Sequence, residues 1–466
     1  MHLRAFTGGR PEDTLRGVLE ACADCDVCRF LMDDSCLLFP ELYRLYDREK
    51  ENGRPVRAVE LQKLADLCTL CGLCPCPHIR ADITRSKIER AHRDGMPVKI
   101  RILADVQRIG RWVGRMPVVV NRALSSAPIR HLAKKFAGIH PLRTLPPLAD
   151  KSFFAWAHEK GLDREPDRLP RVAYFAGCTA GYLFPEVARA AVAVLAHNGI
   201  AVYVPPQQCC GMPTLLEGDN RTTLKRARFN LNVLLDAVRD AYDLVCSCPT
   251  CGYFMKVLFK ENACYSQAFQ EAAGAGPDEI IVPEARTGNT SGMRLKKSMY
   301  ANILRDDGVF STLGPLDRMQ LSENMKDLGQ YLHGLHRRQA LSLDFGQLAR
   351  RMAYYAPCHQ REQKIGSPYE ELLRLVPGLS IEQVGSAMDC CGMGGCLGFK
   401  ASFSDRSIAL GRPLIRKIEA AAPDAIVTDC LSCRLQFQHL LPYPVYHPLE
   451  ILQRTYAACG DDEKER

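Results

Sequence analysis

The sequence predicts an α/β protein in which a helical, cysteine-rich N-terminal domain precedes two copies of a parallel β-α-β-α-β unit. Three observations predict this fold class: 22 cysteines among 466 residues, a repeat in the C-terminal two thirds of the chain, and short β-rich stretches that alternate with helical ones. The expected parts are an N-terminal domain at 1–98, a basic connector at 99–169, a first repeat unit at 170–262, a helical segment at 263–350 and a second repeat unit at 351–466.

The cysteines are expected to be reduced. Residues 1–17, MHLRAFTGGRPEDTLRG, carry charges throughout and lack the apolar core of a secretory signal. The sequence also lacks a run of about 18 or more apolar residues that could span a bilayer. We therefore expect a cytoplasmic protein, where clustered thiols bind metal or perform redox chemistry. A secreted, disulfide-bonded protein is the less favoured alternative.

Two cysteine triplets with the spacing C-x2-C-x2-C lie in the N-terminal domain. They are Cys22, Cys25 and Cys28, and Cys68, Cys71 and Cys74. This spacing resembles the bacterial ferredoxin run C-x2-C-x2-C-x3-C-P, whose fourth cysteine ligates the other of two clusters. The intervening sequence, PELYRLYDREKENGRPVRAVELQKLADL, predicts helix and turn, so the domain resembles a helical ferredoxin-like domain with two [4Fe–4S] clusters.

The fourth cysteines depart from the ferredoxin spacing. Cys36 follows Cys28 after seven residues instead of three, and Cys76 follows Cys74 after only one. We expect Cys36 to complete the second site and Cys76 the first, because each triplet lacks a local partner. His78 stands at the expected x3 position and could substitute as a ligand, but a solvent-facing histidine is favoured. A degraded or absent cluster is the alternative to two ferredoxin-type clusters.

The connector carries the net charge of the protein, which is +8. Ten Lys or Arg residues and a single acid, Asp105, lie between Lys99 and Arg143. The remainder is near neutral, so we expect no nucleic-acid partner. Apolar residues alternate with these basic residues at near-helical spacing. Such helices either pack against the cysteine-rich domains, which we favour, or lie peripherally on the inner face of a membrane.

Two stretches of the chain repeat the same cysteine spacing. The first begins with RVAYFAGC, which ends at Cys178, and the second with RMAYYAPC, which ends at Cys358. The motif CCGM follows 31 and 32 positions later, and a C-x-x-C pair closes each copy. The cysteines of the two copies are Cys178, Cys209, Cys210, Cys248 and Cys251, and Cys358, Cys390, Cys391, Cys430 and Cys433.

Each copy also repeats the same order of elements. In the first, VAYFAG predicts a strand, a helix begins at Pro185 and ends before Gly199, and IAVYV predicts a second strand. A helix over about 222–240 and the strand DLVCS complete it. The second copy follows with MAYYA, LSIEQV and AIVTD as strands. Every cysteine therefore follows a strand end, and the carboxyl ends of parallel strands meet at one crevice.

Five thiols near glycines suit a soft metal or an iron–sulfur cluster. Adjacent cysteines cannot easily serve one tetrahedral zinc, because their side chains point apart along an extended chain. Zinc also needs four ligands, and each copy supplies five. A zinc scaffold and a metal-free dithiol switch are the alternatives. Cys264 and Cys396 fall outside the repeated spacing and are expected not to be ligands.

The repeated pattern resembles the cysteine-rich CCG domain, from Arg171 to about Leu452. This domain is found in the B subunit of heterodisulfide reductase, the C subunit of anaerobic glycerol-3-phosphate dehydrogenase and the iron–sulfur subunit of glycolate oxidase. The resemblance implies that each set of five cysteines binds a noncubane [4Fe–4S] cluster, so that up to two such clusters accompany the two of ferredoxin type.

A role in electron transfer follows from these expectations. The sequence has no convincing G-x-G-x-x-G after a strand, so we expect no flavin or nicotinamide site. The favoured function is a subunit that relays electrons between a flavoprotein dehydrogenase, or another redox protein, and an acceptor such as quinone. The alternative is a catalytic subunit, like that of heterodisulfide reductase, that cleaves a disulfide at the CCG clusters with His359 as a candidate proton donor. A structural hydrogen bond is an equally favoured role for His359.

Overall fold

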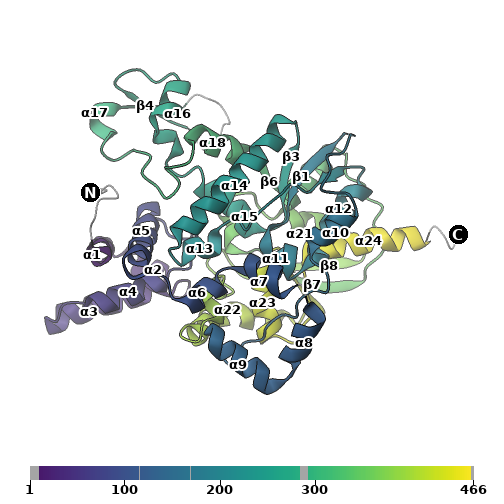
Figure 1. The fold of residues 1–466 in the computed structure, drawn as a ribbon, viewed down its shortest axis with the longest axis horizontal. Helices are drawn as coiled ribbons and strands as arrows, with labels where there is room; N and C mark the ends of the chain where they lie inside the picture. The colour runs from purple at the N-terminus through teal and green to yellow at the C-terminus, as the bar shows by residue number, and fades with distance from the viewer. Residues whose placement is uncertain (1–9, 115, 168, 284–291, 463–466) are drawn as a thin grey trace.

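The computed structural model describes residues 10–114, 116–167, 169–283 and 292–462. Helices at the N-terminal end lie beside two parallel sheets with helices packed around them (Figure 1). The prediction of an α/β protein with two repeated parallel units is therefore confirmed. Among the described residues, no helix has the length and apolar character needed to cross a membrane.

The regular elements of the N-terminal part, as far as the structure describes it, are helices, and loops join them. Its helices are α1 (Pro11–Cys25), α2 (Val27–Leu31), α3 (Leu38–Asn52), α4 (Ala58–Asp66) and α5 (Pro77–Asp94). Leu15, Leu42 and Leu64 are buried between them and form their core. Asp26 ends α1 in the left-handed region (φ 56°), which turns the chain between Cys25 and Cys28. The turn folds the first triplet back on itself.

The connector forms short helices broken at its prolines. They are α6 (Val98–Leu103), α7 (Val106–Val113), α8 (Pro117–Ser125), α9 (Ala127–Ala137) and α10 (Phe153–Glu159). Pro117 and Pro128 stand in the first turns of α8 and α9, where a missing N–H costs nothing. Figure 1 shows α8 and α9 at the lower edge of the molecule.

The first repeat unit contains a four-stranded parallel sheet in the order β2-β1-β3-β6. The strands are β1 (Arg171–Phe175), β2 (Ala201–Tyr203), β3 (Asp243–Cys246) and β6 (Met325–Asp327). The helices between and after them are α11 (Gly177–Tyr182), α12 (Pro185–His197), α13 (Met212–Leu216), α14 (Asn220–Arg239), α15 (Pro249–Tyr253) and α19 (Leu328–Arg337).

The second unit repeats this sheet in the order β10-β9-β7-β8. Its strands are β7 (Arg350–Tyr355), β8 (Leu379–Gln383), β9 (Ala425–Thr428) and β10 (Val445–Tyr446). Its helices are α20 (Cys358–Arg361), α21 (Pro368–Leu373), α22 (Ser404–Ala421), α23 (Leu431–Leu440) and α24 (Pro448–Asp462). Each unit thus has one strand more than the repeat predicts.

The segment 263–350 was expected to be helical, and the structure places helices there but also short strands. It contains α16 (Gln267–Ala272), β4 (Glu279–Val282), β5 (Met293–Lys296), α17 (Lys297–Tyr300), α18 (Pro315–Asn324) and then β6 and α19. The strands β4 and β5 form an antiparallel pair apart from the main sheets. β6 pairs with β3, so the first sheet extends far beyond residue 262. A three-residue strand such as β6 forms because it pairs with β3, and its own local sequence gives little indication of a strand.

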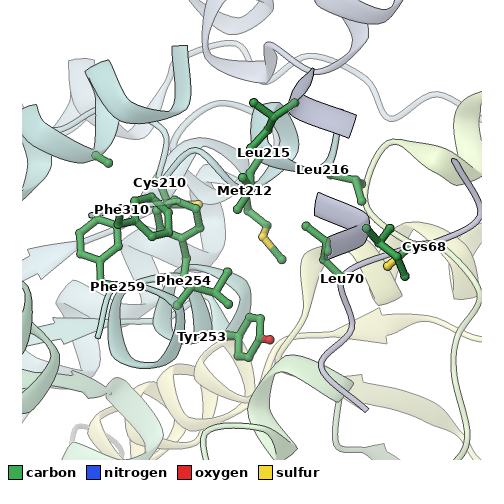
Figure 2. Packing of buried hydrophobic residues seen from close by; sticks show 14 of the residues in the cluster. Cys68, Leu70, Cys210, Met212, Leu215, Leu216, Tyr253, Phe254, Phe259 and Phe310 are labelled. Carbon is green, nitrogen blue, oxygen red and sulfur yellow. The ribbon is translucent and has the colours of Figure 1, made fainter. Parts of the chain in front are cut away.

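A hydrophobic core joins the N-terminal helices to the first repeat unit. Leu70, which follows Cys68 in the second triplet, is buried in one cluster with Leu216 of α13 and Tyr253 of α15. Figure 2 shows Cys68 and Leu70 next to Leu216, with Tyr253 below them. The buried ammonium of Lys87 donates to the carbonyl oxygens of both Cys68 and Leu216, over 2.9 and 3.1 Å. The second triplet is therefore packed directly against the first unit.

The two units share one hydrophobic core. It joins Tyr174 of β1 and Leu195 of α12 to Tyr354 of β7 and Tyr369 of α21, all buried. Helix α24, at the end of the second unit, packs against α12 of the first, and α19 packs against α21. Because apolar side chains from both units fill the same interior, neither sheet is covered without the other.

This shared core predicts that both units unfold together. Replacing buried Leu332 of α19 by alanine should lower the free energy of unfolding by about 2–5 kcal/mol, because it leaves a cavity between the units. Chemical denaturation under anaerobic conditions, followed by circular dichroism, should give one cooperative transition at lower denaturant concentration. The control is Leu343→Ala, since Leu343 is 55% exposed and should change stability by less than about 0.5 kcal/mol. Separate transitions for the two units would contradict the shared core.

Candidate metal centre

The first repeat unit brings its five predicted cysteines together. Cys178 follows β1, Cys209 and Cys210 follow β2, and Cys248 and Cys251 follow β3 at the start of α15. The Sγ atoms of Cys178 and Cys209 are 3.3 Å apart. Cys210 and Cys248 each share a hydrogen bond with Cys251. The carboxyl ends of three parallel strands therefore gather all five thiols.

A glycine makes this approach of the chains possible. Gly177 has φ +73°, and a Cβ atom there would lie 3.0 Å from the Sγ of Cys251. Any other residue would be strained in this conformation and would press on the thiol. A π-helical turn over Phe254–Leu258 follows α15, and such turns occur frequently at functional sites.

The second unit gathers its cysteines in the same way. The Sγ atoms of Cys391 and Cys433 are 3.1 Å apart, and Cys391 also shares a hydrogen bond with Cys390. Cys358, at the start of α20, lies close enough to Cys391 and Cys430 for their charges to raise its pKa in addition to the larger effect of burial. The backbone N–H of Gly392 donates to the Sγ of Cys390 over 3.3 Å.

One thiol in each adjacent pair has a lowered pKa. Hydrogen bonds from Cys178 and Cys210 lower the pKa of Cys209, and hydrogen bonds from Cys390 and Cys433 lower that of Cys391. The thiolate is the form that binds metal. The thiol with the lowered pKa is Cys209, the first of its pair, in the first unit, and Cys391, the second of its pair, in the second unit.

The N-terminal cysteines form two groups. Each group consists of one triplet and the single cysteine that follows the other triplet in sequence. Burial raises the pKa of Cys22 to about 12, and repulsion by nearby Cys28, Cys76 and Cys25 adds to this. Cys76, which lies just after the second triplet in sequence, therefore lies with the first. This is the grouping expected from the ferredoxin pattern.

Cys36 lies correspondingly with the second triplet. The cysteines Cys36, Cys68, Cys71 and Cys74 line one cavity. Burial raises the pKa of Cys36 to about 12, with further contributions from Cys71 and Cys68. Its Sγ accepts the backbone N–H of Leu38 over 3.3 Å, so the start of α3 holds this thiol in place.

Buried arginines stand beside three of the four cysteine groups. Arg143 is 1% exposed, and its guanidinium donates to the carbonyl of Gly398, to Ser407 and to Gln436. Its Nη1 atom finds no acceptor, and the thiol of Cys391 lies nearby. Arg143 comes from the connector and reaches into the second unit, so the connector packs as predicted at this point.

Arg226 and Arg80 occupy similar positions at other groups. Arg226, on α14, pairs with Asp105 of the connector over 2.5 Å and lies near Cys209, and its Nη1 also has no acceptor. Arg80, on α5, lines the cavity of the second N-terminal group. A buried cation with unsatisfied donors is costly unless an anion lies close. Asp105 supplies that anion at Arg226, and Glu261 supplies it at Arg80. By contrast, no carboxylate in the described part of the chain pairs with Arg143. Thiolates that hold a cluster near Cys391 would supply the anion for Arg143, so this residue in particular fits an iron–sulfur group.

Sequence reasoning did not identify these arginines. Arg143 lies in the proline-rich stretch IHPLRTLPPL, where a lone arginine among apolar residues is a weak signal. Arg226 lies on the buried face of α14, which only the helical spacing of its apolar neighbours could have indicated.

The structure also places three residues that the sequence analysis discussed outside the ligand sets: Cys264, Cys396 and His359. Cys264 is outside every group, and the thiol of Cys396 donates to Glu217 over 3.2 Å. His359 contacts Leu70 through Nε2 and Thr250 through Nδ1, so both ring nitrogens are engaged within the protein. In the described ranges, no three His, Cys, Asp or Glu side chains have the geometry to hold a single metal ion.

Comparison with curated proteins gives several relatives over much of the chain. The C subunit of anaerobic glycerol-3-phosphate dehydrogenase from Escherichia coli (strain K12) is 25% identical over 344 residues, 73% of this chain and 72% of that protein. The B subunit of fumarate reductase (CoM/CoB) from Methanothermobacter marburgensis is 25% identical over 295 residues, 62% of this chain and 47% of that protein. Lactate utilization protein A of Exiguobacterium sp. is 24% identical over 291 residues, 61% of this chain and 97% of that protein.

Two stretches of the chain match a family described as a cysteine-rich domain, CCG. They are residues 172–256 and 352–438. Each stretch contains all five converging cysteines of one repeat unit and most of three of its strands, while β6 and β10 lie outside the matched residues. This chain therefore carries two CCG cysteine-rich domains.

Proposed function

We propose that this chain is an iron–sulfur electron-transfer subunit of a dehydrogenase or reductase complex. The observation that carries the proposal is the convergence of five buried or half-buried thiols in each CCG domain, beside arginines with unsatisfied donors. Two further thiol groups lie in the N-terminal helices. Thiolates in such numbers are the ligands of iron–sulfur clusters, which accept and release single electrons when bound.

The proposed ligands follow the four groups. The N-terminal groups would each hold a ferredoxin-type [4Fe–4S] cluster: Cys22, Cys25, Cys28 and Cys76 at one, and Cys36, Cys68, Cys71 and Cys74 at the other. The CCG groups would each hold a noncubane cluster: Cys178, Cys209, Cys210, Cys248 and Cys251 at one, and Cys358, Cys390, Cys391, Cys430 and Cys433 at the other.

The partner is proposed to be a flavoprotein dehydrogenase subunit or another redox protein, with quinone as the acceptor. Relatives named as subunits of a dehydrogenase and of a reductase support a place in such a complex. The disulfide-cleaving alternative needs a proton donor at the CCG sites. His359 uses both ring nitrogens within the protein, which favours the carrier.

The carrier proposal predicts a high iron content. Anaerobically purified protein should contain about sixteen irons per chain, at about four per cluster, with a similar amount of acid-labile sulfide. Dithionite should reduce the clusters and produce EPR signals, because a carrier must accept electrons from a low-potential donor. Zinc without labile sulfide would contradict the proposal. Turnover of a disulfide by the isolated chain would replace it with the catalytic alternative.

The ligand assignment predicts which cysteines matter. Cys391→Ala should lower the iron content by up to about four per chain, because it removes the thiol that contacts both Cys390 and Cys433. The matched control is Cys264→Ala, since Cys264 is half-buried but lies outside the groups. Iron and sulfide analysis of both variants checks this. Equal losses in the two variants would argue for a general effect on folding.

We also propose that the connector rests on an anionic membrane surface. Helices α7 to α9 expose large apolar side chains instead of burying them: Trp112, Val118, Val119, Ile129, Leu132 and Phe136. Exposed basic residues such as Arg108, Arg111 and Arg122 lie among them, and the stretch from Val106 to Pro141 contains no acid. Apolar side chains with interleaved positive charges suit the headgroup region of anionic lipids, where a quinone acceptor would be reached.

Vesicle binding tests this surface. The protein should cosediment with vesicles containing anionic phosphatidylglycerol and bind less at high salt, because ions screen the basic residues. The double variant Leu132→Glu/Phe136→Glu should lose binding. Leu343→Glu is the control, since Leu343 is an equally apolar, 55% exposed residue outside the connector. Equal binding to neutral vesicles, or no loss in the double variant, would contradict the proposal.

A further inference from the structure

His359 lies where three of the four cysteine groups meet. It follows Cys358 on α20 of the second CCG domain. Its Nε2 lies 3.0 Å from the carbonyl oxygen of Leu70, between Cys68 and Cys71 of the second N-terminal group. Its Nδ1 lies 2.9 Å from the hydroxyl of Thr250, between Cys248 and Cys251 of the first CCG domain. One side chain thus contacts the cysteine loops of two other groups.

The hydrogen bonds of His359 define its tautomer. A carbonyl oxygen only accepts, so Nε2 carries the hydrogen and donates it to Leu70. Nδ1 is then the acceptor for the Thr250 hydroxyl. The imidazole ring also stacks on Tyr253, with ring centroids 4.6 Å apart and planes inclined by 7°. Both bonds and the stack fix the orientation of the ring.

The backbone around this histidine is closely packed. Leu70 has φ +53°, an unusual conformation for leucine, and it presents the carbonyl that accepts from His359. Gly72 has φ +88°, and a Cβ there would lie 2.6 Å from Cγ of Glu362 and 3.0 Å from the hydroxyl of Tyr253. The loop after Cys71 therefore approaches both CCG domains as closely as a chain without a side chain allows.

The thiols themselves are close at this junction. Cys71 lies near enough to Cys358 and Cys390 for their thiolate charges to repel one another. By contrast, the thiols that act on Cys22 all belong to its own group. The second N-terminal group therefore adjoins the second CCG group, and the first N-terminal group is the outer one.

We infer that His359 is a positioning residue that fixes the second N-terminal cysteine group against both CCG groups. The inference rests on the proposed function, in which these groups hold clusters. Electron transfer between clusters depends steeply on their separation, so a residue that sets this separation controls how strongly the groups interact. One electron passing between two groups oxidises one and reduces the other, with no proton or bond change required of His359.

EPR spectroscopy of the reduced full-length protein tests this role. In the wild type, magnetic interaction between reduced centres should split or broaden their signals. His359→Ala should lose this interaction at unchanged iron content, because all cysteines remain. His359→Gln should restore the part that involves the N-terminal group, since its amide N–H can donate to Leu70 as Nε2 does. Thr250→Val should affect only the interaction with the first CCG group.

A matched control separates this role from general stability. His439 also bonds a threonine, Thr144, through Nδ1 over 3.0 Å, but within the described residues no hydrogen bond joins it to a cysteine loop. His439→Ala should therefore leave the spectra unchanged. The inference would be overturned if His359→Ala, at full iron content, kept the wild-type magnetic interaction between the centres. If His359→Ala does not fold, an unchanged magnetic interaction in Thr250→Val would overturn it instead. Wild-type protein without iron would instead overturn the proposed function.

Discussion

The burial of many thiols at the carboxyl edge of parallel strands is the constraint on which the rest of this structure depends. A parallel sheet needs crossover helices, and these return each strand to the same edge. The loops that leave this edge therefore collect side chains from distant parts of the chain, as Cys178, Cys209 and Cys251 illustrate. Hydrogen bonds from neighbouring thiols and burial raise the pKa of most of these thiols and so disfavour the thiolate form, which means that positive charge, such as that of bound iron, is needed to stabilise the thiolates. The guanidinium groups of Arg143 and Arg226, each with an N–H donor that has no acceptor, add positive charge beside the thiols.

Much of this arrangement could be predicted from the sequence. The spacing of the repeated cysteines, together with the alternating strands and helices, was sufficient to predict two parallel units with converging thiols. The grouping of Cys36 and Cys76 with the opposite triplets followed from the ferredoxin pattern, and the structure brings the same residues together. These predictions succeeded because they depend on period and spacing, which the chain records locally.

Features that depend on tertiary contact could not be predicted. β6 has three residues and pairs with β3 across a long insertion, so no local pattern marks it. The connector was expected to pack against the cysteine-rich domains, but nothing in its sequence shows that Arg143 is the residue whose guanidinium is buried in the second unit. His359 was a candidate proton donor because it adjoins Cys358, and only its contacts with Leu70 and Thr250 reveal that both nitrogens are occupied.

The late position of β6 in the chain has a consequence for synthesis of the protein. β3 ends at Cys246, and its neighbour β6 begins only at Met325. Until β6 has left the ribosome, one edge of β3 presents unpaired N–H and C=O groups, which can pair with another chain. A fragment that ends near residue 262 would keep this open edge permanently, although it contains every cysteine of the first CCG domain. The smallest fragment with a closed first sheet therefore extends at least to Asp327.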